Sequence, residues 1–183
     1  MYSKDGKTLV FYATGKEEKE FIVPQTVTKI FGSAFTSPYL EKVVLHDGIV
    51  ELGDNIFYQC EALKEVVLSK SLKEISWLFT FGCVQLKFIE YPEGVETLGF
   101  GVLAGLDEVV IPLTIKTIND MNVKEGLNLY YKGTAETWAQ VKKHSSLEKK
   151  LDTIHIYFYS EDEPEEEGNF WHYNSEGEIE IWE

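Results

Sequence analysis

Arginine is absent from the 183-residue chain, and lysine supplies all 17 basic residues against 31 acidic ones. The formal net charge is therefore -14. A surface this acidic repels nucleic-acid phosphates and anionic lipids, and it has no guanidinium group for bidentate phosphate contacts. The composition argues against nucleic acid and membrane surfaces as partners.

Long apolar segments are missing as well. No apolar run approaches the ~20 residues that cross a bilayer, so we expect no membrane insertion. Residues 1–7 contain no apolar core of a signal peptide. These features predict either a cytoplasmic protein or a piece of a longer chain.

Residues that carry catalysis or bind metals are few. The two cysteines are not clustered, and the four histidines are scattered without metal-ligand spacing. The glycine-rich segment 99–105 lacks the Lys-Ser/Thr ending of a phosphate loop. We therefore predict no enzymatic activity, no catalytic residue, no metal site and no cofactor.

An internal repeat is the main feature of the chain. A Leu-x-x-apolar-x-apolar pattern begins at Leu40 and returns at Leu63, Leu86 and Leu106. Further apolar positions recur with the same period. One of them is a phenylalanine or leucine, and in the third copy it is either Phe79 or Phe81. This pattern predicts a leucine-rich-repeat solenoid, mainly β, in which each coil adds a short strand to a parallel sheet.

Side-chain alternation along these strands predicts one buried and one exposed face. Val43, Val66, Ile89 and Val109 are expected to point inward. The exposed row is our candidate binding surface and comprises Val44, His46, Val67, Ser69, Phe88, Glu90 and Val110, with Ile22 at its start. The high β-propensity of valine and isoleucine is a simpler explanation for an apolar row, without any ligand.

Segments 21–35 and 55–68 resemble the BspA-type leucine-rich repeat, whose unit runs roughly IPxxVxxIGxxAFxxCxxLxxVxL. The resemblance covers about residues 20–118. Two copies depart from the unit, at 77–81 and 101–106, and we expect these coils to bulge. The family is found mainly in bacterial cell-surface and secreted proteins, and some members are adhesins. The resemblance thus implies a non-enzymatic adhesion module at the cell surface or secreted, with a host or extracellular-matrix protein as partner.

Three regions are expected along the chain. Residues 1–19 are predicted to form an N-terminal capping hairpin, 20–132 about five repeat coils, and 133–183 a small α+β C-terminal cap. Within the cap we predict a helix at 135–143, a strand near 154–158 and a hairpin that turns at 175–177. Thr134 is the predicted N-cap of the helix, and Ala135, Trp138 and Val141 form its predicted apolar stripe.

Several features of the sequence allow two interpretations. Cys60 and Cys83 stack in adjacent coils, where a disulfide fits the strand spacing, but we favour buried free thiols. The acidic stretch 161–167 offers oxygen ligands for Ca²⁺, yet a solvated connector is favoured. The aromatic tail could stack on sugars or cover the open solenoid end, and we favour the cover; its residues are Phe170, Trp171, Tyr173 and Trp182.

Two alternatives to adhesion stay open on the sequence. An intracellular protein-interaction scaffold fits the missing signal peptide and the free thiols. A carbohydrate-binding or cell-wall-binding accessory module fits the aromatic tail.

Overall fold

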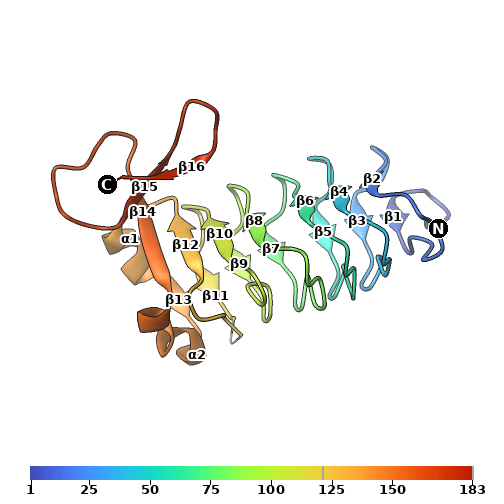
Figure 1. The fold of residues 1–183 in the computed structure, drawn as a ribbon. Helices are drawn as coiled ribbons and strands as arrows, with labels where there is room; N and C mark the ends of the chain where they lie inside the picture. The colour runs from blue at the N-terminus through green and yellow to red at the C-terminus, as the bar shows by residue number, and fades with distance from the viewer. Residues whose placement is uncertain (121, 183) are drawn as a thin grey trace.

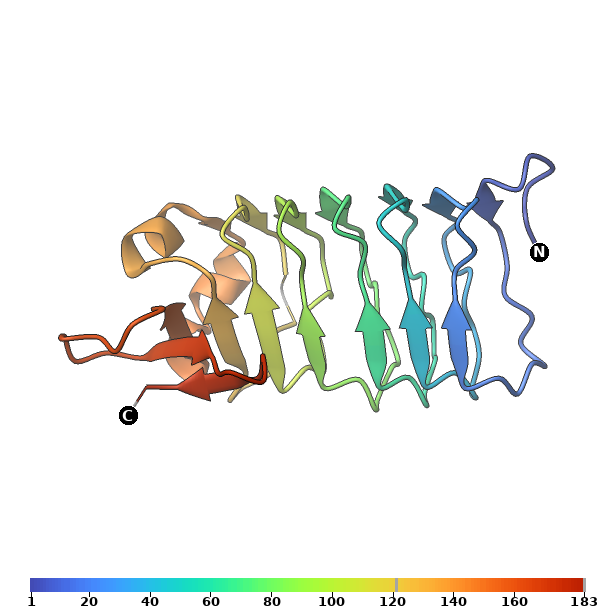
Figure 2. The same ribbon diagram turned by 90° about the horizontal axis from the view of Figure 1, so that it is seen from above.

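The computed structural model describes residues 1–120 and 122–182, which form one elongated solenoid (Figure 1). Successive coils stack in register along its length, with the N-terminus at one end and the helices and a hairpin at the other (Figures 1 and 2). The fold is a mainly β parallel solenoid, as the repeat pattern predicts, and it has about six turns where about five coils are expected from the sequence.

Each coil contributes one strand to each of two faces. The longer strands make the first sheet, namely β2 (Glu20–Ile22), β4 (Lys42–Val44), β6 (Glu65–Val67), β8 (Phe88–Glu90), β10 (Glu108–Ile111), β12 (Asn128–Tyr131) and β14 (His155–Tyr159). Two-residue strands make the second sheet, namely β1 (Thr8–Leu9), β3 (Lys29–Ile30), β5 (Glu51–Leu52), β7 (Glu74–Ile75), β9 (Thr97–Leu98), β11 (Thr117–Ile118) and β13 (Lys142–Lys143). Neighbouring strands pair in parallel along both faces, except between β6 and β8 and between β5 and β7.

The interior is filled by stacked ladders of apolar side chains. Val43, Val66, Ile89 and Val109 are all buried, so the predicted inward positions are confirmed. Another ladder consists of phenylalanines. The ring centroids of Phe35 and Phe57 are 5.0 Å apart, and those of Phe57 and Phe79 are 5.3 Å apart. Phe79 fills the ladder position and is fully buried, whereas its rival Phe81 is exposed.

Both sheets are interrupted beside the third coil. The first sheet divides into β2-β4-β6 and a second part that begins at β8, and the second sheet divides between β5 and β7. Figure 2 shows β8 set farther from β6 than the other strands of this face are from their neighbours. The step from Leu63 to Leu86 is longer than the step from Leu86 to Leu106, so β6 and β8 belong to coils of different circumference. In the second sheet, however, β7 pairs with β9 across the same change in length, so repeat length alone does not account for the two interruptions.

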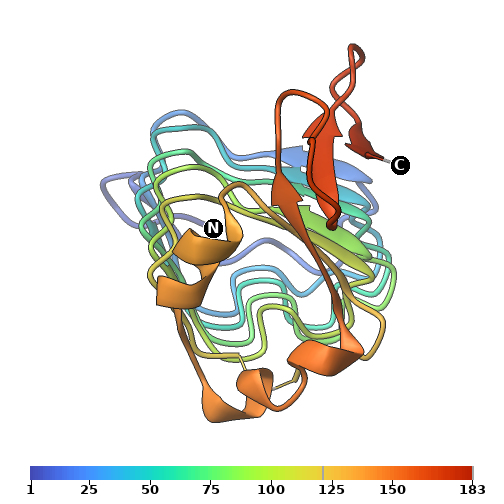
Figure 3. The ribbon, with the colours of Figure 1, turned by 90° about the vertical axis from the view of Figure 1, so that its left-hand side faces the viewer.

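The chain after β12 builds the C-terminal end of the solenoid (Figure 3). It contains α1 (Ala135–Gln140), α2 (Ser145–Glu148) and the short 3-10 helix Leu151–Thr153. Thr134 caps α1 and forms a capping box with Thr137, as predicted for the N-cap. Trp138 and Val141 are buried, but Ala135 is exposed, so its predicted place in the apolar stripe is wrong.

A β-hairpin closes the chain. The strand β15 (Phe170–Tyr173) pairs in parallel with the end of β14, and β16 (Ile179–Ile181) runs antiparallel to β15. The turn lies at 174–177, where the Asn174 carboxamide accepts hydrogen bonds from the backbone N–H groups of Glu176 and Glu178. The hairpin stands up from the first sheet and forms a wall beside its exposed face (Figures 1 and 3).

At the other end, the first residues fold back as a hairpin. Tyr2 pairs antiparallel with Leu9 through an isolated bridge. The strand β1 also pairs in parallel with β3, so residues 8–9 already form a rung of the second sheet.

Candidate functional site

The outer face of the first sheet is open over β2, β4, β6 and β8. Ile22 is 60% exposed, and Val67 and Phe88 are each 40% exposed. Val44 is half-buried between them, and Glu90 is exposed at the end of β8. We call these five residues the open face: Ile22, Val44 and Val67 form one apolar row on paired strands, and Phe88 and Glu90 lie across the gap on β8.

Val110 lies outside the open face, and its predicted exposure is wrong. Its side chain is fully buried on the outer side of β10 in a small second core with Tyr130 and Trp171. The C-terminal hairpin causes this burial, because its aromatic side chains pack on the outer side of β10, β12 and β14. The wall therefore ends the open face at β8.

Two of the three polar members of the predicted row, Ser69 and His46, stabilise turns instead. Ser69 is buried, and its hydroxyl donates to the carbonyl oxygen of Ile49 at 2.6 Å, so its predicted exposure is also wrong. The His46 Nδ1 atom accepts from the Gly48 N–H at 3.0 Å, and its Nε2 lies 3.0 Å from the Pro24 carbonyl oxygen. Both bonds are satisfied by an imidazole protonated on Nε2, which ties the ring to the turn.

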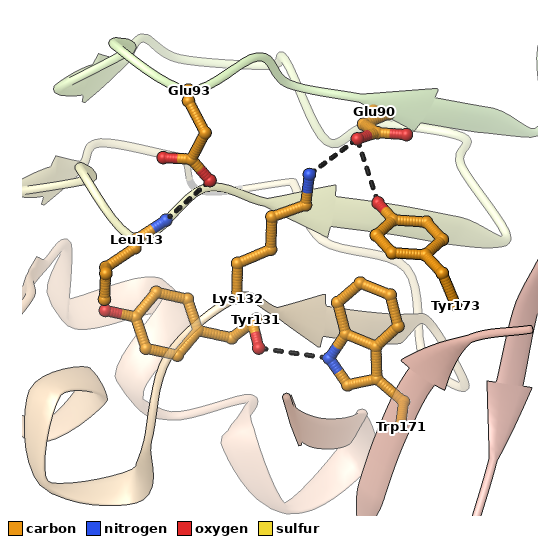
Figure 4. A network of polar contacts seen from close by, with 7 residues as sticks. All are labelled: Glu90, Glu93, Leu113, Tyr131, Lys132, Trp171 and Tyr173. Carbon is orange, nitrogen blue, oxygen red and sulfur yellow. Dashed lines mark hydrogen bonds and ion pairs between the residues drawn. The ribbon is translucent and has the colours of Figure 1, made fainter. Parts of the chain in front are cut away.

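Trp171 is the anchor of the hairpin. It is fully buried, its indole N–H donates to the Tyr131 carbonyl oxygen at 3.1 Å, and its ring lies 5.0 Å from that of Tyr173 (Figure 4). A buried ring cannot stack on a sugar, so a stacking platform that includes Trp171 is wrong. Phe170 and Trp182 remain partly exposed on the tail. The Trp182 ring stacks on the His172 ring, with centroids 3.9 Å apart.

A polar network locks the hairpin to the open face. Tyr173 donates from its hydroxyl to Glu90 Oε1 at 2.9 Å, and Lys132 Nζ lies 2.7 Å from the same oxygen (Figure 4). Partial burial raises the pKa of Tyr173 to about 12, so the phenol remains a donor at neutral pH. Sequence reasoning missed Lys132 and this contact, because 83 residues separate Tyr173 from Glu90.

Two hollows border the open face. A groove of about 340 Å³ follows the gap between β6 and β8 and is lined by both apolar residues, including Val67 and Phe88, and charged ones, including Glu65 and Lys70. A second hollow of about 420 Å³ lies in the corner between sheet and wall, between Phe88, Glu90, Glu108, Tyr173 and Glu178. Phe88 and Glu90 line both, so the two hollows adjoin.

The chemistry of the described residues favours binding. Across residues 1–120 and 122–182, no group of three or more His, Cys, Asp or Glu side chains is placed to hold a metal ion. Cys60 and Cys83 are free, buried thiols, and burial raises their pKa values to about 11 and about 12. Both thiols are therefore protonated at neutral pH and poor nucleophiles.

The acidic stretch 161–167 connects β14 to β15. Its residues are exposed except Pro164, which fits the predicted solvated connector. None of the helices that the structure describes is long and apolar enough to span a bilayer.

Comparison with known proteins identifies the repeat. The family model described as "BspA type Leucine rich repeat region" matches residues 8–129 in six copies. It starts earlier than the expected first coil at residue 20 and includes β1. No curated protein matches the chain.

Solved structures of bacterial proteins share the fold. A leucine rich cell surface protein from Faecalibacterium prausnitzii A2-165 is 26% identical, with a TM-score of 0.68, over 79% of this chain and 40% of that protein. The pneumococcal vaccine antigen PcpA is 21% identical, with a TM-score of 0.62, over 85% of this chain and 45% of that one. A leucine-rich repeat protein of T. pallidum is 18% identical, with a TM-score of 0.57, over 87% of this chain and 82% of that one. The chain thus spans less than half of the first two proteins, and the last two likenesses show the fold alone.

Proposed function

Because the chain belongs to the BspA-type leucine-rich repeat family, we propose that it is a non-enzymatic module that binds a protein partner on its open face. Leucine-rich-repeat solenoids are typically binding modules, since stacked coils present a long rigid surface. The observation that carries the proposal is the contrast along one sheet. The hairpin buries Val110 over β10, whereas Ile22, Val67 and Phe88 stay exposed over β2, β6 and β8.

Charge supports a basic partner. The chain carries a net charge of -14, and on the wall side the open face ends in Glu90 with Glu108 beside it. Apolar anchors surrounded by charge are the usual composition of a binding surface, in which burial of the anchors supplies affinity and charge supplies selectivity. A partner with lysine or arginine around an apolar patch fits this surface.

We further propose adhesion to a host or extracellular-matrix protein from the bacterial cell surface. Support comes from the Faecalibacterium protein, which is described as a cell surface protein and shares the repeat at 26% identity. Protease shaving of intact source cells tests the location by mass spectrometry of the released peptides, with lysed cells as control. Release of peptide 65–70 from unbroken cells is expected, and release only after lysis would contradict the proposal and favour an intracellular scaffold.

The open face itself is tested by a double substitution, Val44→Lys with Val67→Lys. Two apolar side chains that a partner would bury become charged, so we expect affinity for a matrix protein captured by the wild type to fall by about 100-fold or more. Biolayer interferometry against purified matrix proteins measures this. The matched control is Val50→Lys with Leu113→Lys, two exposed positions outside the open face. Equal binding by both double variants would remove the open face as the site.

A further inference from the structure

The gap between β6 and β8 leaves strand edges unpaired in the middle of a sheet. On one side, the Leu45 N–H donates to the Val67 carbonyl oxygen at 2.9 Å; on the other, the Tyr91 N–H donates to the Val110 carbonyl oxygen at 3.0 Å. Alternate residues of a parallel strand bond to opposite neighbours, so the backbone groups of Val66 and Phe88 point into the gap. Across the described residues, no strand pairing bridges β6 and β8.

The groove along this gap is lined by apolar residues and by two lysines and two glutamates, Lys64, Lys70, Glu65 and Glu90. Val66, Val67, Leu68, Phe88 and Ile89 contribute to its lining, and its volume of about 340 Å³ has room for a large side chain. Val67 and Phe88 flank it from opposite strands and are each 40% exposed. An apolar side chain of a partner would cover both.

The adjoining corner has an excess of negative charge. Glu90, Glu108 and Glu178 line it, and within residues 1–120 and 122–182 only Glu90 of these three forms an ion pair with a lysine, Lys132. Phe88, Tyr173, Gly177 and Ile179 are its other lining residues. Carboxylates beside aromatic faces suit a lysine or arginine, whose stem lies along the rings while its charged head meets the carboxylates.

We propose that groove and corner together bind an extended segment of a partner protein, with an apolar side chain in the groove and a nearby lysine or arginine in the corner. The proposal rests on the proposed function and specifies the partner motif. Since Phe88 and Glu90 line both hollows, one short segment that crosses the strands fills both. The hairpin wall would then set where the segment ends.

A phage-displayed library of random peptides, about ten residues long, tests the motif by selection on the wild-type protein. The expected peptides carry a lysine or arginine close to a large apolar residue. The double substitution Glu108→Gln with Glu178→Gln should lower the affinity for these peptides by about tenfold or more, because two carboxylates in the corner are replaced by uncharged amides. The control, Glu61→Gln with Glu74→Gln, makes the same change in net charge on exposed residues elsewhere and should leave affinity unchanged. Thermal melts confirm that all variants fold.

The outcomes separate the two proposals. If Val44→Lys with Val67→Lys lowers the affinity for the peptides but Glu108→Gln with Glu178→Gln does not, the proposed role of the corner is wrong and the open face stands as the binding site. Peptides insensitive to both pairs would overturn both proposals. A selection that yields no peptide with a basic residue, or no binding peptide at all, also overturns the corner motif.

Discussion

At the scale of single residues, each ladder leucine is buried by the coils on both sides of it. Leu40, Leu63 and Leu86 are all essentially inaccessible to solvent. A solenoid has no separate core to compensate for a defect, because each coil contacts only its neighbours. One ladder residue therefore contributes to two interfaces between coils.

We expect Leu63→Ala to lower the free energy of unfolding by about 2–5 kcal/mol, because the lost side chain leaves a cavity between stacked coils. Chemical denaturation monitored by circular dichroism measures the change. The control, Leu113→Ala, truncates a leucine that is 52% exposed and should cost at most about 0.5 kcal/mol. Similar losses for the two variants would show that the assigned strand register is wrong.

Backbone conformation adds a second residue-scale feature at one turn position. Ser33, Asn55, Leu78 and Gly101 occupy this position in successive coils and all adopt a left-handed conformation, with φ of 55°, 55°, 52° and 74°. Asparagine and glycine suit this conformation, whereas leucine is strained in it. The third coil thus keeps the backbone turn of its neighbours, with a residue that is strained in this conformation.

At the scale of elements, the C-terminal hairpin decides how much of the first sheet is accessible. Its contacts with the solenoid centre on Trp171, which covers the outer side of β10 and β12. Tyr173 adds the hydrogen bond to Glu90 on β8. The same element therefore caps the solenoid and bounds the proposed binding surface.

Trp171→Ala should detach the hairpin while the repeats stay folded. A buried tryptophan typically contributes about 3–5 kcal/mol, more than a short hairpin gains from its few other contacts. Hydrogen exchange should accelerate at 170–181, with 42–75 unchanged. The control is Trp77→Ala, at a tryptophan that is 60% exposed. Faster exchange throughout the chain would show instead that the hairpin is part of one cooperative unit.

At the scale of the whole molecule, ion pairs run along the solenoid and join successive coils. The Glu41 carboxylate oxygens lie 2.7 Å from Lys19 Nζ and from Lys64 Nζ, so Glu41 links three coils. Lys42 Nζ lies 2.7 Å from a Glu65 carboxylate oxygen and links two coils. The hydrogen bonds from Lys19 and then Lys64 lower the pKa of Glu41 to about 2 from 4.5. These pairs offset part of the repulsion expected from a net charge of -14.

The pKa of Glu41 predicts an acid-dependent contribution to stability. Because the folded pKa is lowered, the contribution is complete above pH 4.5 and disappears as the pH falls to about 2. The melting temperature of wild type should therefore exceed that of Glu41→Gln at neutral pH, and the two should converge between these pH values. Glu17→Gln, at an exposed residue with no ion pair in the described chain, is the control. A constant difference down to pH 2 would contradict the assigned cause.

The repeat, the strand register and the inward ladders were determined by the sequence itself. Each depends on local periodicity: alternation assigns Val43 and Val66 to the interior, and a regular step stacks each coil on the last. The helix cap at Thr134 and the turn near Gly177 are likewise local signals.

Only the tertiary structure decided which part of the exposed row is accessible. Val110 and Val67 occupy equivalent strand positions, yet one is buried and the other is 40% exposed. The difference arises from Trp171, which lies far beyond Val110 in the chain, and no periodicity specifies where a terminal hairpin folds back. The corner likewise combines side chains of the fourth and fifth repeat strands with side chains of the hairpin. Contacts of this range depend on the packing of the complete chain, and local sequence pattern does not encode them.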